Sequence, residues 1–245
     1  MRMILPVALI VILLSACIEN DTISPIHKAD LDLEPLTTSA ATESEPLDQE
    51  PEDIEDYAEF TINEEIVSLS IRDIPILHQF LETQKKPQQA LKEMELEKYI
   101  LGLEEFFILR FSCHHDQCSY LLLHPDQHKP AFLVADMATY ESHTFSPDAT
   151  KVAFHFTRPG SGHLTPGHIV IFDLQDWTTV SMVRDNEKTG SLGFSWPILS
   201  FEWIDNSSLA IDFPVLTEPS EEAWDAWNAL EEQPAITTTY NLTIE

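Results

Sequence analysis

The chain has 245 residues, with 42 acidic against 13 basic side chains and a formal net charge of −29. This balance argues against a nucleic-acid-binding protein, because the sequence holds no basic patch that would neutralise phosphate groups. It favours solubility and repulsion from anionic lipids.

The first residues, MRMILPVALIVILLSAC, have the form of a secretory signal. The apolar run Ile4–Leu14 is shorter than the roughly 20 residues that a membrane-spanning helix needs. Its end, Leu14-Ser15-Ala16-Cys17, resembles the lipobox of bacterial lipoproteins. That resemblance implies a signal peptide over residues 1–16, cleavage before Cys17 and a diacylglycerol anchor on the Cys17 sulfur. The alternative is an ordinary signal peptide or a short N-terminal anchor, with Cys17 as a free thiol.

Residues 17–60 form an acidic segment. Between Ile18 and Phe60 there are 14 Asp or Glu residues and one lysine, Lys28. Such a segment buries too little apolar surface to offset its ordering entropy, so it predicts a disordered, lipid-anchored spacer. A tail dedicated to a cation or partner is the alternative. The domain beyond it is expected on the extracytoplasmic face of the cell membrane, or at the outer membrane in a bacterium with two membranes.

Residues 61–98 show helical periodicity. Asp73 is placed to cap a helix that carries Pro75 in its first turn. One face of this helix is apolar, with Ile76, Leu77, Phe80 and Leu81. After a break at Pro87, a second helix continues through Met94. We expect this helical segment to pack on the domain that follows.

Residues 99–245 read as a β-rich domain. The strands Glu105–Phe111 and Cys118–Leu123 flank a short loop. Pairing Cys113 with Cys118 sets a register in which Phe111 faces Tyr120. That register places both cysteines on the face of Phe107, Leu109 and Phe111.

The two cysteines predict a structural disulfide, because they are an even pair outside the reducing cytosol once Cys17 is lipidated. A zinc site is the alternative, since the spacing also suits zinc ligands. With a disulfide, His114, His115 and Asp116 become the exposed tip of a stapled turn and are candidate interaction residues.

Two segments, Ala131–Met137 and His168–Leu174, share an apolar run that ends in Asp followed by an apolar residue. Between them Phe145–Phe154 reads strand, turn, strand, and Phe201–Ile211 is a fainter copy. The pattern is similar to the repeat of Tol-type and WD-like β-propellers. The matching residues are Phe145, Ser146, Pro147, Asp148, Lys151 to Phe154, Asp173 and Leu174.

Together with the helical segment before it, this pattern predicts a mainly β fold with N-terminal helices. The family's turn glycine is missing, since Ala149 and Thr150 follow Asp148. The strands suffice for two to three blades, whereas a closed propeller typically has at least about four. We therefore expect an incomplete, propeller-like antiparallel meander, with a β-sandwich as the alternative.

The ten histidines raise the question of a metal site. A four-residue turn at Pro147–Thr150 places His143 opposite Phe154 and His155 opposite Ser142, so the two histidines point to opposite faces. The remaining metal-ligand candidates are His114, His115, His163 and His168, which form no specific zinc motif.

No catalytic motif or cofactor is predicted. The glycines around Ser161 and Ser191 do not form a nucleophile elbow, and there is no phosphate-binding glycine loop with a lysine. The sequence therefore indicates a protein that is not an enzyme.

Residues 219–232 predict a short helix near the C-terminus. Trp224, Trp227 and Leu230 share one face of it. This helix is interpreted as a lid packed on the sheet, with a tryptophan-bearing surface for a glycan or a partner as the alternative.

Together these features favour a lipid-anchored extracytoplasmic interaction or binding module of the bacterial cell envelope. Its partners would be the membrane, through Cys17, and another envelope protein. The alternative is an extracytoplasmic solute or metal sensor whose ligands lie in the histidine-bearing loops.

Overall fold

The structure is a computed structural model that describes residues 54–101, 104–184, 187–189 and 193–244. The expected signal peptide, Cys17 and most of the acidic spacer lie outside the described residues. The described part of the chain begins with a hairpin and short helices: β1 (Tyr57–Ile62), β2 (Glu65–Ser70), the 3-10 helix η1 (Ile71–Asp73), α1 (Pro75–Glu82) and α2 (Pro87–Lys92).

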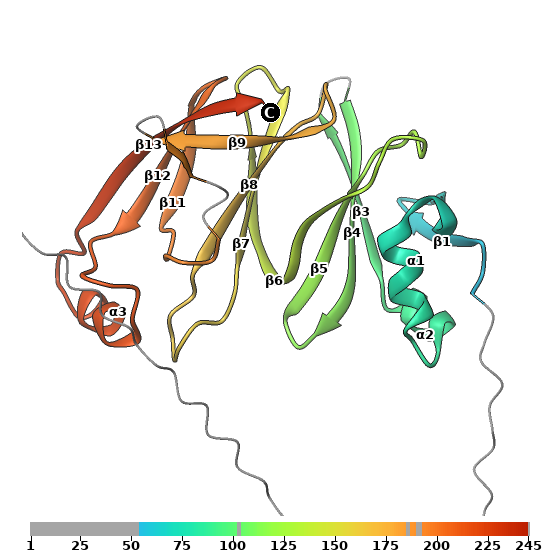
Figure 1. Ribbon diagram of the computed structural model, residues 1–245, viewed down its shortest axis with the longest axis horizontal. Coiled ribbons are helices and arrows are strands. Elements are labelled where there is room, and N and C mark those ends of the chain that lie inside the picture. The colour runs from blue at the N-terminus through green and yellow to red at the C-terminus, as the bar shows by residue number, and fades with distance from the viewer. Residues whose placement is uncertain (1–53, 102–103, 185–186, 190–192, 245) are drawn as a thin grey trace, which may run out of the picture. The chain divides into compact units, whose positions relative to one another are not determined.

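Strands dominate the rest of the described chain. They are β3 (Glu95–Leu101), β4 (Glu104–His114), β5 (Gln117–Leu123), β6 (Phe132–Phe145), β7 (Lys151–Thr157), β8 (Gly167–Asp173), β9 (Thr178–Arg184), β10 (Glu187–Thr189), β11 (Ser200–Asp205), β12 (Ser208–Pro214) and β13 (Ala235–Ile244), with α3 (Glu221–Asn228) before the last. Eleven strands form one sheet in the order β11-β12-β13-β9-β8-β7-β6-β5-β4-β3, and β10 pairs with β9. Every pairing is antiparallel, which confirms the expected mainly β, antiparallel fold (Figure 1).

Strand β6 explains why the expected division into two or three blades is not seen in the described residues. It is 14 residues long. Residues 132–138 pair with β5, and residues 139–145 pair with β7. Because one strand belongs to both neighbours, the hydrogen-bonded ladder continues from β3 to β11 instead of breaking into separate blades.

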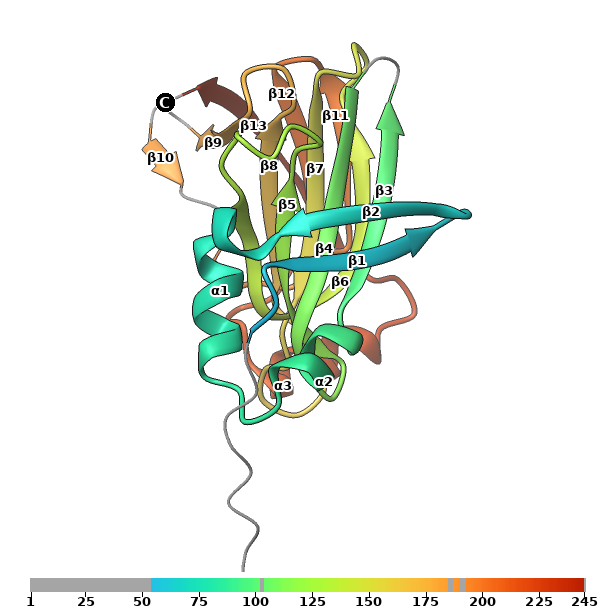
Figure 2. The same cartoon turned by 90° about the vertical axis from the view of Figure 1, so that its right-hand side faces the viewer.

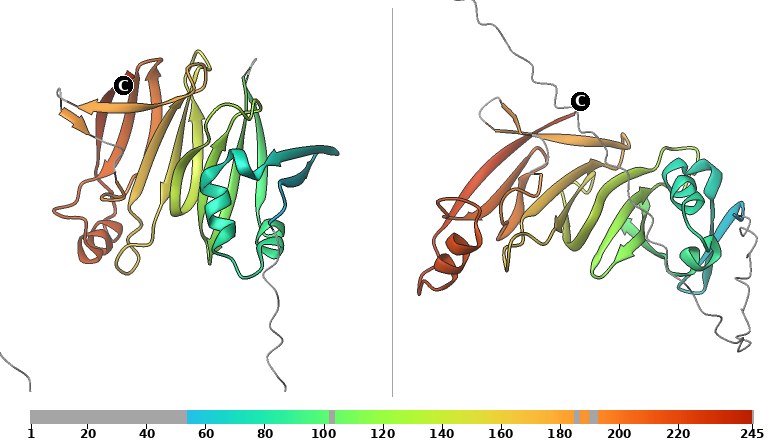
Figure 3. Two further views of the ribbon diagram at one scale, coloured as in Figure 1. Left: turned by 45° about the vertical axis from the view of Figure 1, so that its right-hand side comes forward. Right: turned by 60° about the horizontal axis from the view of Figure 1, so that its bottom comes forward.

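The sheet bends around a first hydrophobic core. Phe106 on β4 and Phe154 on β7 lie with ring centroids 6.3 Å apart, edge to face. Two strands separate β4 from β7 in the sheet, so in a flat sheet they would be roughly 14 Å apart. The contact therefore requires the sheet to fold over, and Figure 3 shows the resulting arch. Phe156, Phe172 and Trp177 fill the same core.

A second core lies on the outer face of β3, β4 and β5. Leu109 and Leu121 of the sheet are fully buried there, together with Leu77 and Leu81 of α1. Figure 2 shows α1 and the β1–β2 hairpin lying over this face. Both faces of the β4–β5 hairpin are thus buried, as its apolar residues on either face predict.

The N-terminal segment differs from the helical interpretation of residues 61–98. The chain forms the β1–β2 hairpin before any helix, and strand β3 begins at Glu95. The hairpin turns through Asn63 and Glu64, both with positive φ, which is the backbone of a two-residue hairpin turn that asparagine favours. The predicted disordered spacer is also too long, because Tyr57–Phe60 belong to β1.

The two short helices α1 and α2 do form, but α1 has a different N-cap residue from the one predicted. Ile74, not Asp73, is the N-cap residue of α1, and no side chain caps the helix. Asp73 instead ends the preceding 3-10 turn. Pro75 at the first helical position fixes the φ that a helix start needs, which suffices without a cap. Ile76 is 38% exposed, so the buried stripe is narrower than predicted.

A third core lies on the other side of β7 and β8. It is built by Ile169, Ile171, Leu209 and Ile211. Strand β9 pairs with β8 only as far as Val180 and then with β13, so the sheet turns at this point. Its last strand, β11, returns to β6, where Trp203 Nε1 donates to the Thr144 carbonyl at 3.3 Å.

The propeller-like turn has the predicted register. His143 pairs with Phe154, and Ser142 pairs with His155. His143 packs on Phe145 in the first core and His155 on Phe201 in the third, so the two rings do lie on opposite faces.

Two residues of the repeat motif contact each other directly. Lys151 at the start of β7 is the register partner of Asp173 at the end of β8. Their Nζ and Oδ2 atoms are 3.4 Å apart. The motif residues therefore serve the structure by joining the ends of two adjacent strands.

Candidate functional site

The tip of the β4–β5 hairpin carries the predicted disulfide. The Sγ atoms of Cys113 and Cys118 are 2.10 Å apart. The predicted register is wrong by one residue, because Phe111 pairs with Ser119 rather than with Tyr120. The cause is a bulge between Phe111 and His114, where Ser112 adopts a φ of 51°.

A slip of one residue exchanges the two faces of a strand. The disulfide therefore does not lie on the face of Phe107 and Leu109. Cys118 instead packs in the first core with Ile108 and Tyr120. It borders a cleft on the inner side of the bent sheet.

The exposed turn residues have different positions at this cleft. His115 and Asp116 line it, whereas His114 does not. All three are exposed, as predicted. The turn is fixed to β6, because Thr139 Oγ1 donates to the Asp116 carbonyl at 3.1 Å and Gln117 Nε2 donates to the Met137 carbonyl at 3.0 Å.

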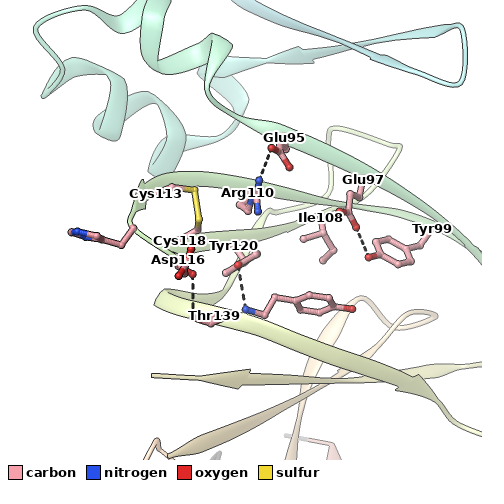
Figure 4. A pocket seen from close by; sticks show the side chains of 12 residues that line it. Glu95, Glu97, Tyr99, Ile108, Arg110, Cys113, Asp116, Cys118, Tyr120 and Thr139 are labelled. Carbon is pink, nitrogen blue, oxygen red and sulfur yellow. Dashed lines mark hydrogen bonds and ion pairs between the residues drawn. A yellow bond between two sulfur atoms is a disulfide. The ribbon is translucent and has the colours of Figure 1, made fainter. Parts of the chain in front are cut away.

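The cleft has a volume of about 530 Å³. Strands β3 to β6 and the hairpin turn supply its lining: Glu95, Glu97, Tyr99, Ile108, Arg110, Cys113, His115, Asp116, Cys118, Tyr120, Thr139 and Tyr140. Figure 4 shows these side chains, with the disulfide and Tyr99 toward opposite ends of the cleft. Alternate residues of each strand point to the same face, so Glu95, Glu97 and Tyr99 enter the cleft together.

Arg110 is the only arginine or lysine among the lining residues. Its Nη2 lies 2.5 Å from Oε1 of Glu95, its cross-strand partner. Its Nε is buried and has no hydrogen-bond partner among the described residues. Nε is therefore enclosed by the protein, whereas the side chain as a whole is 42% exposed, so other donors of the guanidinium can be reached.

Three tyrosines form the inner wall of the cleft. The Tyr99 hydroxyl donates to Glu97 Oε2 at 2.6 Å. Burial, and then this bond to Glu97, raise the pKa of Tyr99. Burial also raises the pKa of Tyr120 and of Tyr140. All three remain neutral phenols at physiological pH and offer aromatic faces and hydroxyls.

A half-buried histidine, His143, packs against two of these tyrosines. The Tyr140 hydroxyl and His143 Nδ1 are 2.5 Å apart, and the Tyr99 ring meets the His143 ring edge to face. Burial lowers the pKa of His143. The ring therefore stays neutral, and its unprotonated nitrogen accepts from Tyr140.

The histidines considered as metal-ligand candidates have other surroundings in the described part of the chain. His163 is exposed in the loop before β8. His168 stacks on Phe194, and its Nδ1 accepts from the Gly193 amide at 3.1 Å. Among the described residues, no group of three or more His, Cys, Asp or Glu side chains is arranged to hold a metal ion.

The C-terminal tryptophans are mostly occupied by contacts inside the domain. Trp227 is buried, and its Nε1 donates to the Pro234 carbonyl at 2.8 Å. Trp224 stacks on it at 5.2 Å. Helix α3 covers Glu221–Asn228, shorter than the predicted 219–232, and Leu230 lies beyond it and is 49% exposed. Trp227 is therefore unavailable to a partner.

Most of the cleft was not predicted from the sequence. Glu97 falls within residues 61–98, for which helical periodicity was predicted, although it lies on β3. The spacing of Glu95, Glu97 and Tyr99 was the available signal, because a period of two is typical of a strand and not of a helix. Arg110, Thr139 and Tyr140 come from separate strands and carry no shared local pattern.

Comparison of the chain with protein-family models, curated proteins and solved structures gave no match. No helix in the described residues has the length and apolar character needed to cross a membrane.

Proposed function

We propose that the chain is a lipid-anchored extracytoplasmic binding module of the bacterial cell envelope, and that the cleft between β3 and the disulfide turn is its binding site. The anchor is proposed from the lipobox-like Leu14–Cys17. Stable attachment follows from two acyl chains on one cysteine, since a single chain binds only marginally. The acidic spacer then separates the domain from the anionic lipid surface.

The observation that supports a binding role is the set of side chains that lines the cleft, which are held mainly on paired strands. Ligand sites combine apolar and aromatic walls with a few convergent polar groups. Here the wall is Tyr99, Tyr120 and Tyr140, and the polar groups include the side chains of Arg110, Asp116 and Thr139. Placement on paired strands supports such a site, because rigid elements position side chains better than loops.

We propose binding rather than catalysis because two carboxylates and both cysteines of the cleft are already engaged. Glu95 pairs with Arg110, and Glu97 accepts from Tyr99. The two cysteines are joined to each other.

The anchor is tested by the substitution Cys17→Ser. We expect the wild-type chain in the membrane fraction of the source cells and the variant in the aqueous fraction, with palmitate incorporated only into wild type. The double substitution of Cys113 and Cys118 by serine is the control and should keep the anchor. Palmitate incorporation into the Cys17→Ser chain would contradict the proposal.

The binding role is tested by a photo-crosslinking amino acid placed at Thr139, inside the cleft. Irradiation of intact cells should yield a discrete crosslinked envelope component. The matched control is Thr239, an exposed threonine of β13 outside the cleft lining. Identical products from both positions, or no product from Thr139, would rule out the cleft as the binding site.

A further inference from the structure

Strand β3 forms an edge of the sheet. Among the described residues it pairs with β4 and with no other strand. Every second residue of such an edge directs its N–H and C=O groups away from the sheet, where another strand can pair with them. The opposite edge strand, β11, instead lies against β6 through Trp203.

Two hollows flank this edge. The cleft lies on its inner side, and a second hollow of about 420 Å³ lies beside β1 and α2. Glu95 and Glu97 line both. An added strand directs alternate side chains to opposite faces, so one set would enter the cleft and the other would enter the second hollow.

The charge of the two hollows determines which side chains of an added strand would fit there. The cleft adds Asp116 to Glu95 and Glu97, and the second hollow adds Glu59. Each hollow contains one cationic side chain, Arg110 or Lys92. Arg110 is already paired with Glu95. Both hollows therefore carry an excess of carboxylates and favour a basic occupant.

The remaining residues of β3 are also compatible with a basic added strand. Lys98 makes ion pairs with Glu65 and Glu105, both at 3.2 Å, so its charge is neutralised within the chain. Ile100 is 69% exposed and offers an apolar contact to an added strand. The chain's own spacer is a poor occupant, since it holds 14 acidic residues and one lysine between Ile18 and Phe60.

We infer that β3 accepts an extended, basic segment of a partner protein as an additional strand, with lysine or arginine at every second position directed into one of the two acidic hollows. This inference rests on the proposed function, because it names the ligand class of the same cleft. Backbone pairing supplies affinity in such complexes, and the pockets for alternate side chains supply specificity.

The probe is a synthetic peptide that alternates lysine and valine, added to the full chain purified in detergent. We expect saturable binding by fluorescence anisotropy and slower amide hydrogen exchange in Glu95–Leu101. A peptide alternating glutamate and valine should not bind. A lysine–valine peptide methylated on every backbone nitrogen should bind at least about tenfold more weakly, because it lacks the donors of a ladder.

Glu97→Lys should weaken binding at least about tenfold by placing a like charge against the probe. Glu97→Gln should weaken binding less. Because glutamine has the same shape as glutamate, this variant keeps the test usable if the lysine variant folds poorly. Glu202→Lys on β11 is the matched control and should leave affinity unchanged, since Glu202 is also an exposed edge-strand acid.

Binding without protection of β3, equal binding of the glutamate peptide, or absence of binding would overturn strand addition. These results are separable from failure of the binding module itself. If Thr139 forms a crosslink in cells but no peptide binds at β3, the cleft remains supported as a binding site. Only strand addition at β3 is then contradicted.

Discussion

Lys151 and Asp173 form an ion pair between two register partners, with side chains only 15% and 5% exposed. Asp173 has further bonds, since its Oδ1 accepts from the amides of Gln175 and Asp176, each at 3.0 Å. The carboxylate therefore fixes both the lysine and the turn that follows β8.

Asp173→Ala should cost roughly 3–5 kcal/mol of unfolding free energy, because it leaves a buried lysine without its partner and removes two amide bonds. Lys151→Ala should cost less, since Asp173 keeps those amides. Denaturant unfolding measures both. Arg72→Ala is the control and should change stability by less than about 1 kcal/mol, because its pair with Asp56 is largely exposed. A larger effect from Lys151→Ala than from Asp173→Ala would contradict this account.

The disulfide predicts a modest stabilisation. Cys113 and Cys118 are five residues apart, and closing so small a loop is worth about 2 kcal/mol in the chain-entropy estimate. The double serine variant should have a free energy of unfolding that is lower by that amount. In the native, non-reduced chain neither cysteine should react with an alkylating reagent, which mass spectrometry detects; alkylation of both would refute the bond.

His168 predicts a loss of stability in acid. Burial, then Arg158 and His155, lower the pKa of His168 from 6.5 to about 4. The unfolded chain takes up a proton near pH 6.5 while the folded ring stays neutral, so stability is full above pH 6.5 and falls between pH 6.5 and pH 4. The difference corresponds to roughly 3 kcal/mol. His143 and His155 act in the same direction.

The measurement is the unfolding free energy from pH 4 to pH 7. His168→Phe should flatten the slope, since it keeps the ring that stacks on Phe194 and removes the titrating group. His163→Gln should leave the slope unchanged, because His163 is exposed. If the unfolding free energy of His168→Phe depends on pH as in wild type, the loss of stability in acid comes from other groups.

Ser112 predicts a substitution that stabilises the chain. Its φ of 51° lies in the left-handed region, which glycine enters without the steric cost that other residues meet. Ser112→Gly should therefore be neutral or stabilising by up to about 1 kcal/mol, and Ser112→Val should destabilise by roughly 1–2 kcal/mol. Thermal melts of the two variants provide the comparison; stabilisation by valine would show that the bulge is not strained.

Local turn chemistry made part of the fold predictable. The Pro147–Thr150 turn set the pairing of His143 with Phe154, and Ser146 N–H indeed donates to the Lys151 carbonyl at 3.0 Å. The β4–β5 hairpin was found as a hairpin, but its register was not, because a bulge adds a residue to one strand without a local sequence signature. That single residue moved the disulfide to the other face.

The cleft was less predictable for a physical reason. Its lining residues lie on four strands, and they meet only because the sheet bends and β6 returns beneath the hairpin turn. Bending is set by packing between Phe106 and Phe154 rather than by any nearby sequence. The N-terminal strands were missed because charged residues obscure their alternation, with Glu59 on β1 and Glu65 on β2.

Strand β6 has a consequence for how the domain folds. Its residues 132–138 complete the ladder of β5 and its residues 139–145 complete the ladder of β7. Neither half of the sheet can detach without stripping hydrogen bonds from this one strand. Unfolding is therefore expected to be a single cooperative transition, and a polypeptide cut within β6 would leave each fragment with an unpaired, aggregation-prone edge.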